Sequence, residues 1–316
     1  MTALFDDPGF RTGLAVGIAL AALLGTVTAV IRSQARALPF PLAGVAVAIG
    51  GLIAQRFVPS EQALSGAAQQ AIVLAIVGGV FVSGARTRRP ALTALAYLPA
   101  GIRLALGPTI DGAPGWAGVA ATLVAVGGGV AIADFDRRHR PLGVAPALVA
   151  VGVAGAYSTL PDTEHVVVLL GVALPLAAVG IPRAWEAIGS AGAGAIATWF
   201  GWVVWVDGRG RAGSIVGAVA ALAILIGEPV AHRLGPFPGW RLPAQLPKPA
   251  MAAMVCAAQV GLALAAGRIA GLQESAVVAG VLALPVVALA GALGLVLART
   301  PPLPARNRWQ DDRYRR

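Results

Sequence analysis

Long apolar stretches alternate with short loops along almost the whole of this 316-residue chain. A helix of roughly twenty apolar residues crosses a hydrocarbon core about 30 Å thick, and its backbone satisfies its own hydrogen bonds there. The pattern therefore predicts an all-α fold, a polytopic transmembrane helix bundle. About eleven spans are expected, nine to eleven being compatible with the glycine and proline interruptions. They lie at 12–31, 38–54, 67–83, 91–107, 115–133, 142–160, 166–181, 187–206, 212–228, 249–267 and 275–297.

The composition agrees with a membrane protein and limits its partners. Hydrophobic residues make up 57% of the chain and charged residues 12%, against about a quarter charged in a soluble domain. The net charge of +10 comes from small basic sets beside apolar spans. We therefore expect membrane lipids as partners, with anionic headgroups at the cytoplasmic arginines, together with membrane proteins and no nucleic acid. The single Cys256 excludes an intrachain disulfide and a cysteine metal site, and no cofactor or metal is expected.

Arginine distribution predicts the orientation in the membrane. The predicted inner segments hold eighteen Arg and Lys residues and the outer ones five. Positive residues favour the cytoplasmic side, so the N-terminus is expected outside and the C-terminus in the cytoplasm, in the plasma membrane. The segment 207–211, with two outer arginines, is the one discordant feature. Residues 1–299 form a single transmembrane domain, and 300–316 a basic, Pro/Arg-rich cytoplasmic tail.

Small residues predict how the helices pack. The runs at 127–129 and 189–195 consist of glycine, alanine and serine. Such residues allow helix backbones to approach closely in membranes.

Arg103 is a candidate site residue because it lies within a predicted span, about one turn from its outer end. Its guanidinium either extends to the outer headgroups or faces the bundle and binds a carboxylate or phosphate through two parallel hydrogen bonds. Asp111, in the next loop, is its nearest candidate counter-ion.

The loop before the span at 166–181 carries Asp162, Glu164 and His165 on the predicted outer side. These side chains could bind a cation or exchange protons. A turn that caps the next helix explains the same residues, because acids and Thr163 suit a helix N-terminus.

Glu228 and His232 lie at the inner end of the span at 212–228. If the helix continues through Pro229, their four-residue spacing puts both on one face, as a proton relay or ion gate requires. The favoured interpretation is that the helix ends at Gly227 and leaves them as interfacial polar residues. Gln259, in the middle of the span at 249–267, is expected to form an interhelical hydrogen bond, with substrate recognition as the alternative.

The sequence contains no phosphate-binding loop of the form G-x-x-x-x-G-K-[ST], no H-E-x-x-H zinc pattern and no G-x-S-x-G nucleophile setting, so nothing argues for an enzyme. A secondary transporter, or a protein that translocates a lipid or small molecule, fits the chain best and predicts a polar cavity near the midplane. A membrane scaffold or subunit of a cell-envelope complex predicts a filled bundle with an apolar side groove. An intramembrane transferase acting on a lipid-linked substrate predicts an outer pocket lined by carboxylates, with Asp111, Asp162 or Glu164 as acid or base.

The orientation can be tested with reporter fusions. A reporter fused after Arg316 should be active only in its cytoplasmic form, and one inserted at Asp162 only in its external form, because the arginine bias places these points on opposite sides. The reverse result at either point would overturn the orientation.

Overall fold

The computed structural model is helical in nearly all of the residues that it describes, and none of those lies in a strand. The described residues are 5–33, 42–58, 64–85, 89–107, 116–139, 148–149, 152, 164–183, 188–206, 216, 219–234, 253–259, 261–262, 265, 278, 281–282, 284–285, 288–289 and 292. The helices are α2 (Pro8–Ser33), α3 (Leu42–Ala54), α4 (Gly66–Gly84), α5 (Pro90–Ala105), α6 (Ala117–His139), α8 (Glu164–Arg183), α9 (Gly189–Val206) and α11 (Ala223–Leu234). The all-α expectation is confirmed for this part of the chain.

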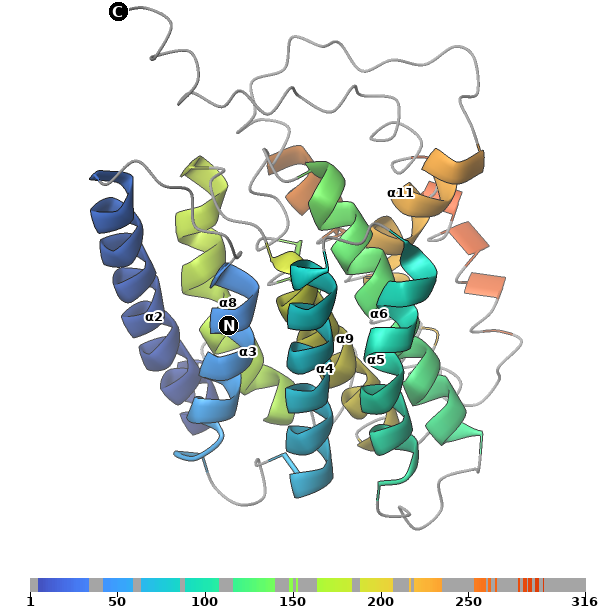
Figure 1. Ribbon diagram of the computed structural model, residues 1–316, viewed down its shortest axis with the longest axis horizontal. Coiled ribbons are helices and arrows are strands. Elements are labelled where there is room, and N and C mark those ends of the chain that lie inside the picture. Colours follow the sequence, from blue (N-terminus) through green and yellow to red (C-terminus); the bar gives the residue numbers. More distant parts are fainter. Residues whose placement is uncertain are drawn as a thin grey trace, which may run out of the picture.

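The helices stand side by side and alternate in direction from α2 to α6 (Figure 1). Where α3 and α5 finish, α4 and α6 begin, and we call this side of the bundle the Arg56 end. The opposite side, where α4 and α6 finish and α5 and α9 begin, is the Arg138 end. Within the described residues, two helical segments are long and apolar enough to cross a membrane, Gly66–Gly84 and Ala117–Arg138.

Helix α9 lies at the centre of this arrangement. It packs against α6, α4 and α3, and every residue from 191 to 202 is buried. Such burial is expected of a helix that is apolar on all sides. Its glycines set the spacing, as the small residues at 189–195 predicted: a Cβ on Gly192 would overlap the backbone of Gly44 in α3. Larger residues there would force the backbones apart.

A second close contact fixes α5 between α6 and α9. The buried ring of Tyr97 passes between Gly129 of α6 and Gly194 of α9, where an added Cβ would overlap it from either side. The Tyr97 hydroxyl donates a hydrogen bond to the carbonyl of Ser190, at 2.5 Å. The ring therefore has little freedom to shift.

At the Arg138 end, a buried carboxylate joins α6 to the start of α9. The two oxygens of Asp136 accept hydrogen bonds from the backbone N–H groups of Ile188 and Gly189, each at 2.9 Å. A carboxylate is favourable there because the first N–H groups of a helix lack intrahelical partners and carry partial positive charge. Gly189 has a φ of 69°, a backbone conformation that glycine adopts without strain.

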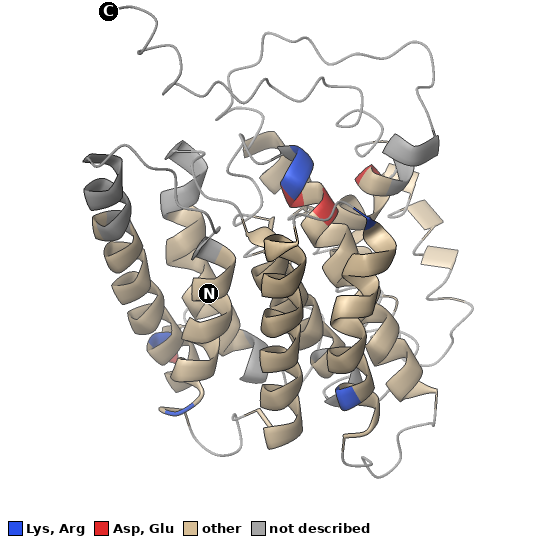
Figure 2. Ribbon diagram, in the orientation of Figure 1, with Lys and Arg blue, Asp and Glu red and all other residues tan. Residues whose placement is uncertain are grey.

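Charged residues gather toward the two ends of the described bundle, with an uncharged band between them (Figure 2). The outward face of α4 illustrates this band, because its exposed large residues are Val73, Leu74, Val77, Val80 and Phe81. Their spacing of three and four residues keeps them on one side of the helix. This face is apolar where a soluble protein would present polar groups.

The Tyr97 contact predicts a difference between two neighbouring glycines of α6. Gly129→Ala should lower stability by about 1–3 kcal/mol, because the new methyl group would lie 2.9 Å from a ring that cannot move away. Gly127→Ala should be neutral or slightly stabilising, because its Cβ would meet nothing within 4 Å. Thermal unfolding of the detergent-purified variants measures both. Equal melting temperatures would contradict the tight packing around Tyr97.

Candidate functional site

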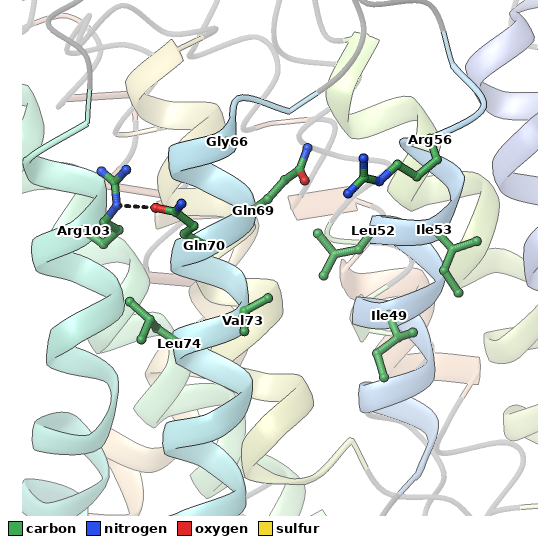
Figure 3. A pocket seen from close by; sticks show the side chains of 10 residues that line it. All are labelled: Ile49, Leu52, Ile53, Arg56, Gly66, Gln69, Gln70, Val73, Leu74 and Arg103. Atoms are coloured by element: carbon green, nitrogen blue, oxygen red, sulfur yellow. Dashed lines mark hydrogen bonds between the residues drawn. The ribbon is translucent and has the colours of Figure 1, made fainter.

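A groove of about 760 Å³ lies along α3 and α4. It exists because both helices pack against α9 and make few contacts with each other. Arg103 of α5 completes its margin (Figure 3). The lining residues are Ile49, Leu52, Ile53, Arg56, Gly66, Gln69, Gln70, Val73, Leu74 and Arg103.

The polar lining residues lie together at the Arg56 end of the groove, and we call them the rim: Arg56, Gln69, Gln70 and Arg103. Gln69 and Arg56 point toward each other across the space between α4 and α3 (Figure 3). On the other side of α4, Nε of Arg103 donates a hydrogen bond to Oε1 of Gln70, at 2.9 Å. Deeper in the groove the walls are aliphatic.

The rim is held in place through the backbone of Leu64, just before α4. Oε1 of the buried Gln55 accepts a hydrogen bond from the Leu64 N–H at 2.8 Å. Nε2 of Gln69 donates to the Leu64 carbonyl at 2.9 Å. Ser65 then caps α4 by accepting from the N–H of Ala68, at 3.2 Å. These bonds connect α3 to α4 at the rim and orient Gln69.

The rim carries two positive charges, and none of the described residues that line the groove is acidic. Among the described residues, no carboxylate forms an ion pair with Arg56 or Arg103, whereas the exposed Arg11 pairs with Asp6 at 3.0 Å. A guanidinium presents a planar set of donors that suits phosphate and carboxylate oxygens. The lining residues offer no carboxylate or imidazole for acid–base catalysis, so the arrangement is suited to binding an anion.

The other outer-loop candidates are only partly covered by the structure. Asp111 and Asp162 lie outside the described residues. Glu164 and His165 form the first turn of α8, but their side chains also lie outside the described part. Their proposed roles stay predictions.

The expectation that the helix carrying Glu228 ends at Gly227 is wrong, because α11 continues through Pro229 to Leu234. Glu228 is 1% exposed, and its Oε1 lies 3.3 Å from Nη1 of Arg138 in α6. Arg138 also contacts Asp134, at 2.6 Å. We attribute the continued helix to this buried contact with α6, which compensates for the backbone hydrogen bond that proline cannot donate. His232 follows on the same helix, and its side chain lies outside the described part.

The sequence analysis missed Asp134, Asp136 and Arg138 as structural residues. The expected span ended at 133, whereas α6 extends to His139. The four-residue spacing of Asp134 and Arg138 is a signal that could have indicated an ion pair on one helix. Asp136 has no such signal, because its partners lie 52 and 53 residues away.

Gln259 is fully buried, and its Nε2 donates a hydrogen bond to the carbonyl of Ala221. Both residues lie in helical segments, so the expected interhelical bond is present.

No protein-family model and no curated protein matches this chain. Among the described residues there is also no group of three or more His, Cys, Asp or Glu side chains that could hold a metal ion. The geometry of the groove and the distribution of charge are therefore the basis for a functional proposal.

The contact between α6 and α11 predicts an effect on stability. Arg138→Met should destabilise the protein by about 2–4 kcal/mol, because it removes the guanidinium that contacts both the buried Glu228 and Asp134. Adding Glu228→Gln should recover part of the loss by removing the charge of the buried carboxylate. Thermal unfolding of the single and double variants measures the coupling. Additive losses would show that the two side chains are not coupled.

Proposed function

We propose that this chain is a multi-pass integral membrane protein of about eleven spans that translocates a lipid, with its N-terminus outside and its C-terminus in the cytoplasm. The membrane assignment is supported by the two charged ends and by the uncharged, outwardly apolar band between them (Figure 2). Soluble proteins rarely expose large apolar faces of this kind.

The length of the band fits a bilayer. Helix α4 has 19 residues and no charged residue, and at 1.5 Å per residue it is about 28 Å long. A hydrocarbon core is about 30 Å thick. In the proposed orientation the Arg56 end faces outward, since α3 finishes there after entering from the first inner loop.

The course of the chain also supports the expected span at 142–160. His139 lies at the Arg138 end, where α6 finishes. Helix α8 ends at Arg183, only five residues before Ile188, which bonds to Asp136 at the Arg138 end. Helix α8 therefore finishes at the Arg138 end and begins, at Glu164, at the Arg56 end. The chain thus changes ends between residues 139 and 164. Leu148 and Val149, in this interval, are helical and buried.

The observation that carries the functional proposal is the groove between α3 and α4. It lies on the apolar outward face, and its cationic and amide groups gather at one end above aliphatic walls. A lipid has the same order of polar headgroup and apolar chain. Within the transporter class, a groove of this form favours a lipid entering from the bilayer over a solute entering from water.

A membrane scaffold is the second candidate, because α9 fills the centre of the described bundle and the groove lies at its side, which are the features expected of a scaffold. The groove, with its polar groups at one end, is not the polar midplane cavity expected of a secondary transporter. In a scaffold, a helix of a partner protein would occupy the groove. The transferase stays a prediction, because Asp111, Asp162 and the side chain of Glu164 lie outside the described part of the chain.

Lipid translocation can be measured in vesicles that contain the purified protein and a phospholipid with a fluorescent headgroup. The protein should speed the exchange of this lipid between leaflets, scored by quenching with a membrane-impermeant reductant. Gly66→Phe should slow the exchange severalfold, because Gly66 lines the groove and its Cβ points into open space. Gly84→Phe is the matched control, since this glycine ends the same helix, also faces open space and does not line the groove.

Exchange no faster than in protein-free vesicles would reject translocation and favour the scaffold. Equal slowing by both phenylalanine variants would show that the groove is not the route.

A further inference from the structure

We propose that the groove between α3 and α4 is a binding site for one anionic phospholipid, with the headgroup phosphate held by Arg56 and Gln69. This inference deepens the proposed function, on which it rests, by naming the class of lipid.

The order of side chains along both walls supports a lipid. On α4, Gln69 and Gln70 at the rim are followed one turn deeper by Val73 and Leu74. On α3, which runs the opposite way, Arg56 is preceded by Ile53 and then by Ile49. Both walls therefore change from polar to aliphatic within about one helical turn of the rim, or roughly 5–6 Å. A phospholipid needs polar surroundings for its headgroup and, directly below them, apolar surroundings for its acyl chains.

Arg56 and Gln69 are the pair best placed for the phosphate. They face each other across the groove from α3 and α4 (Figure 3). Gln69 uses one Nε2 hydrogen on the Leu64 carbonyl, at 2.9 Å, which fixes the amide and leaves a second hydrogen to donate. The exposed Arg56 guanidinium supplies a charge-assisted donor to the same anion.

Arg103 acts differently because it lies on the far side of α4, where its Nε is bonded to Gln70 (Figure 3). It adds positive potential to the rim without facing Arg56. We expect its removal to weaken binding less than removal of Arg56 does.

The charge of the rim selects the lipid. None of the described residues that line the groove is acidic, so the positive group of a zwitterionic headgroup would find no carboxylate among them. Oε1 of Gln70 is already engaged by Arg103. A headgroup with net negative charge is attracted by both arginines and has no positive group that needs a carboxylate partner.

Equilibrium binding to the full-length protein in detergent micelles tests the proposal. The probes are radiolabelled phosphatidylglycerol and phosphatidylcholine with identical acyl chains, and soluble glycerol phosphate serves as competitor. Phosphatidylglycerol should bind at about one per protein and about tenfold more tightly than phosphatidylcholine, because the two arginines attract the phosphate of both lipids but repel the choline cation. Glycerol phosphate at the same concentration should not displace it.

The variants separate a built site from general surface charge. Arg56→Gln should weaken phosphatidylglycerol binding about five- to tenfold and phosphatidylcholine binding less, because both lipids lose a phosphate donor but the choline cation is also relieved of a repulsive charge. Arg103→Gln should weaken phosphatidylglycerol binding about two- to threefold. Arg11→Gln is the matched control, because Arg11 is an exposed arginine that does not line the groove. Gly66→Phe should abolish binding of both lipids, and Gly84→Phe should change neither.

A test on the wild-type protein does not depend on whether the variants fold. Raising the salt concentration from 0.1 to 1 M shortens the screening length from about 10 to 3 Å, so the preference for phosphatidylglycerol should shrink. Equal affinity for the two lipids at low salt, or equal losses for Arg11→Gln and Arg56→Gln, would overturn the proposal. Lipid exchange in vesicles without selective binding in micelles would reject the anionic site and keep translocation, whereas selective binding without exchange would reject translocation and keep the site.

Discussion

The close packing of α9 against α3, α4 and α6 is the constraint on which the rest of the described structure depends. Small residues on α9 let three neighbours approach it at once, and Gly201 and Gly194 would collide with α6 and with Tyr97 if they carried a Cβ. Helices α3 and α4 are therefore held by α9 and not by each other. The groove between them is a consequence of this arrangement.

The two ends of the bundle use arginine in different ways. At the Arg138 end, Arg138 lies between Asp134 and the buried Glu228, while Asp136 caps α9. Those charged groups bond to partners within the protein and connect α6 to α11 and α9. At the rim, glutamine takes the place of the acids: Gln70 orients Arg103 without neutralising it. The attraction of the rim for an anion is consequently available to a ligand.

The sequence was sufficient for the parts of the fold that depend on local pattern. Apolar length predicted helices that overlap the observed α2 to α6, and the small residues at 189–195 predicted the tight packing of α9. The position of Arg103, one turn from a helix end, was also predictable. Contacts between distant segments could not be predicted, because the pairing of Glu228 with Arg138 joins residues that are 90 positions apart. Without that contact, Pro229 led to a predicted helix end at Gly227, which is wrong. An apolar side groove was expected from the sequence only for a scaffold, and its position between α3 and α4 was not predictable, because it depends on which helices are neighbours. The count of eleven spans stays a prediction.

The energetics of association in membranes distinguish a lipid from a partner helix as the occupant of the groove. Lipid chains are about as apolar as leucine, so aliphatic walls alone attract neither occupant strongly. Helix association in a bilayer depends on small residues that let backbones come close. The groove walls carry Ile49, Ile53, Val73 and Leu74, and the one glycine that lines it, Gly66, lies at the end of α4. A lipid needs no close backbone approach, and its headgroup can use Arg56 and Gln69. The selectivity of this groove must therefore arise at its rim, which favours a charged headgroup over an apolar helix.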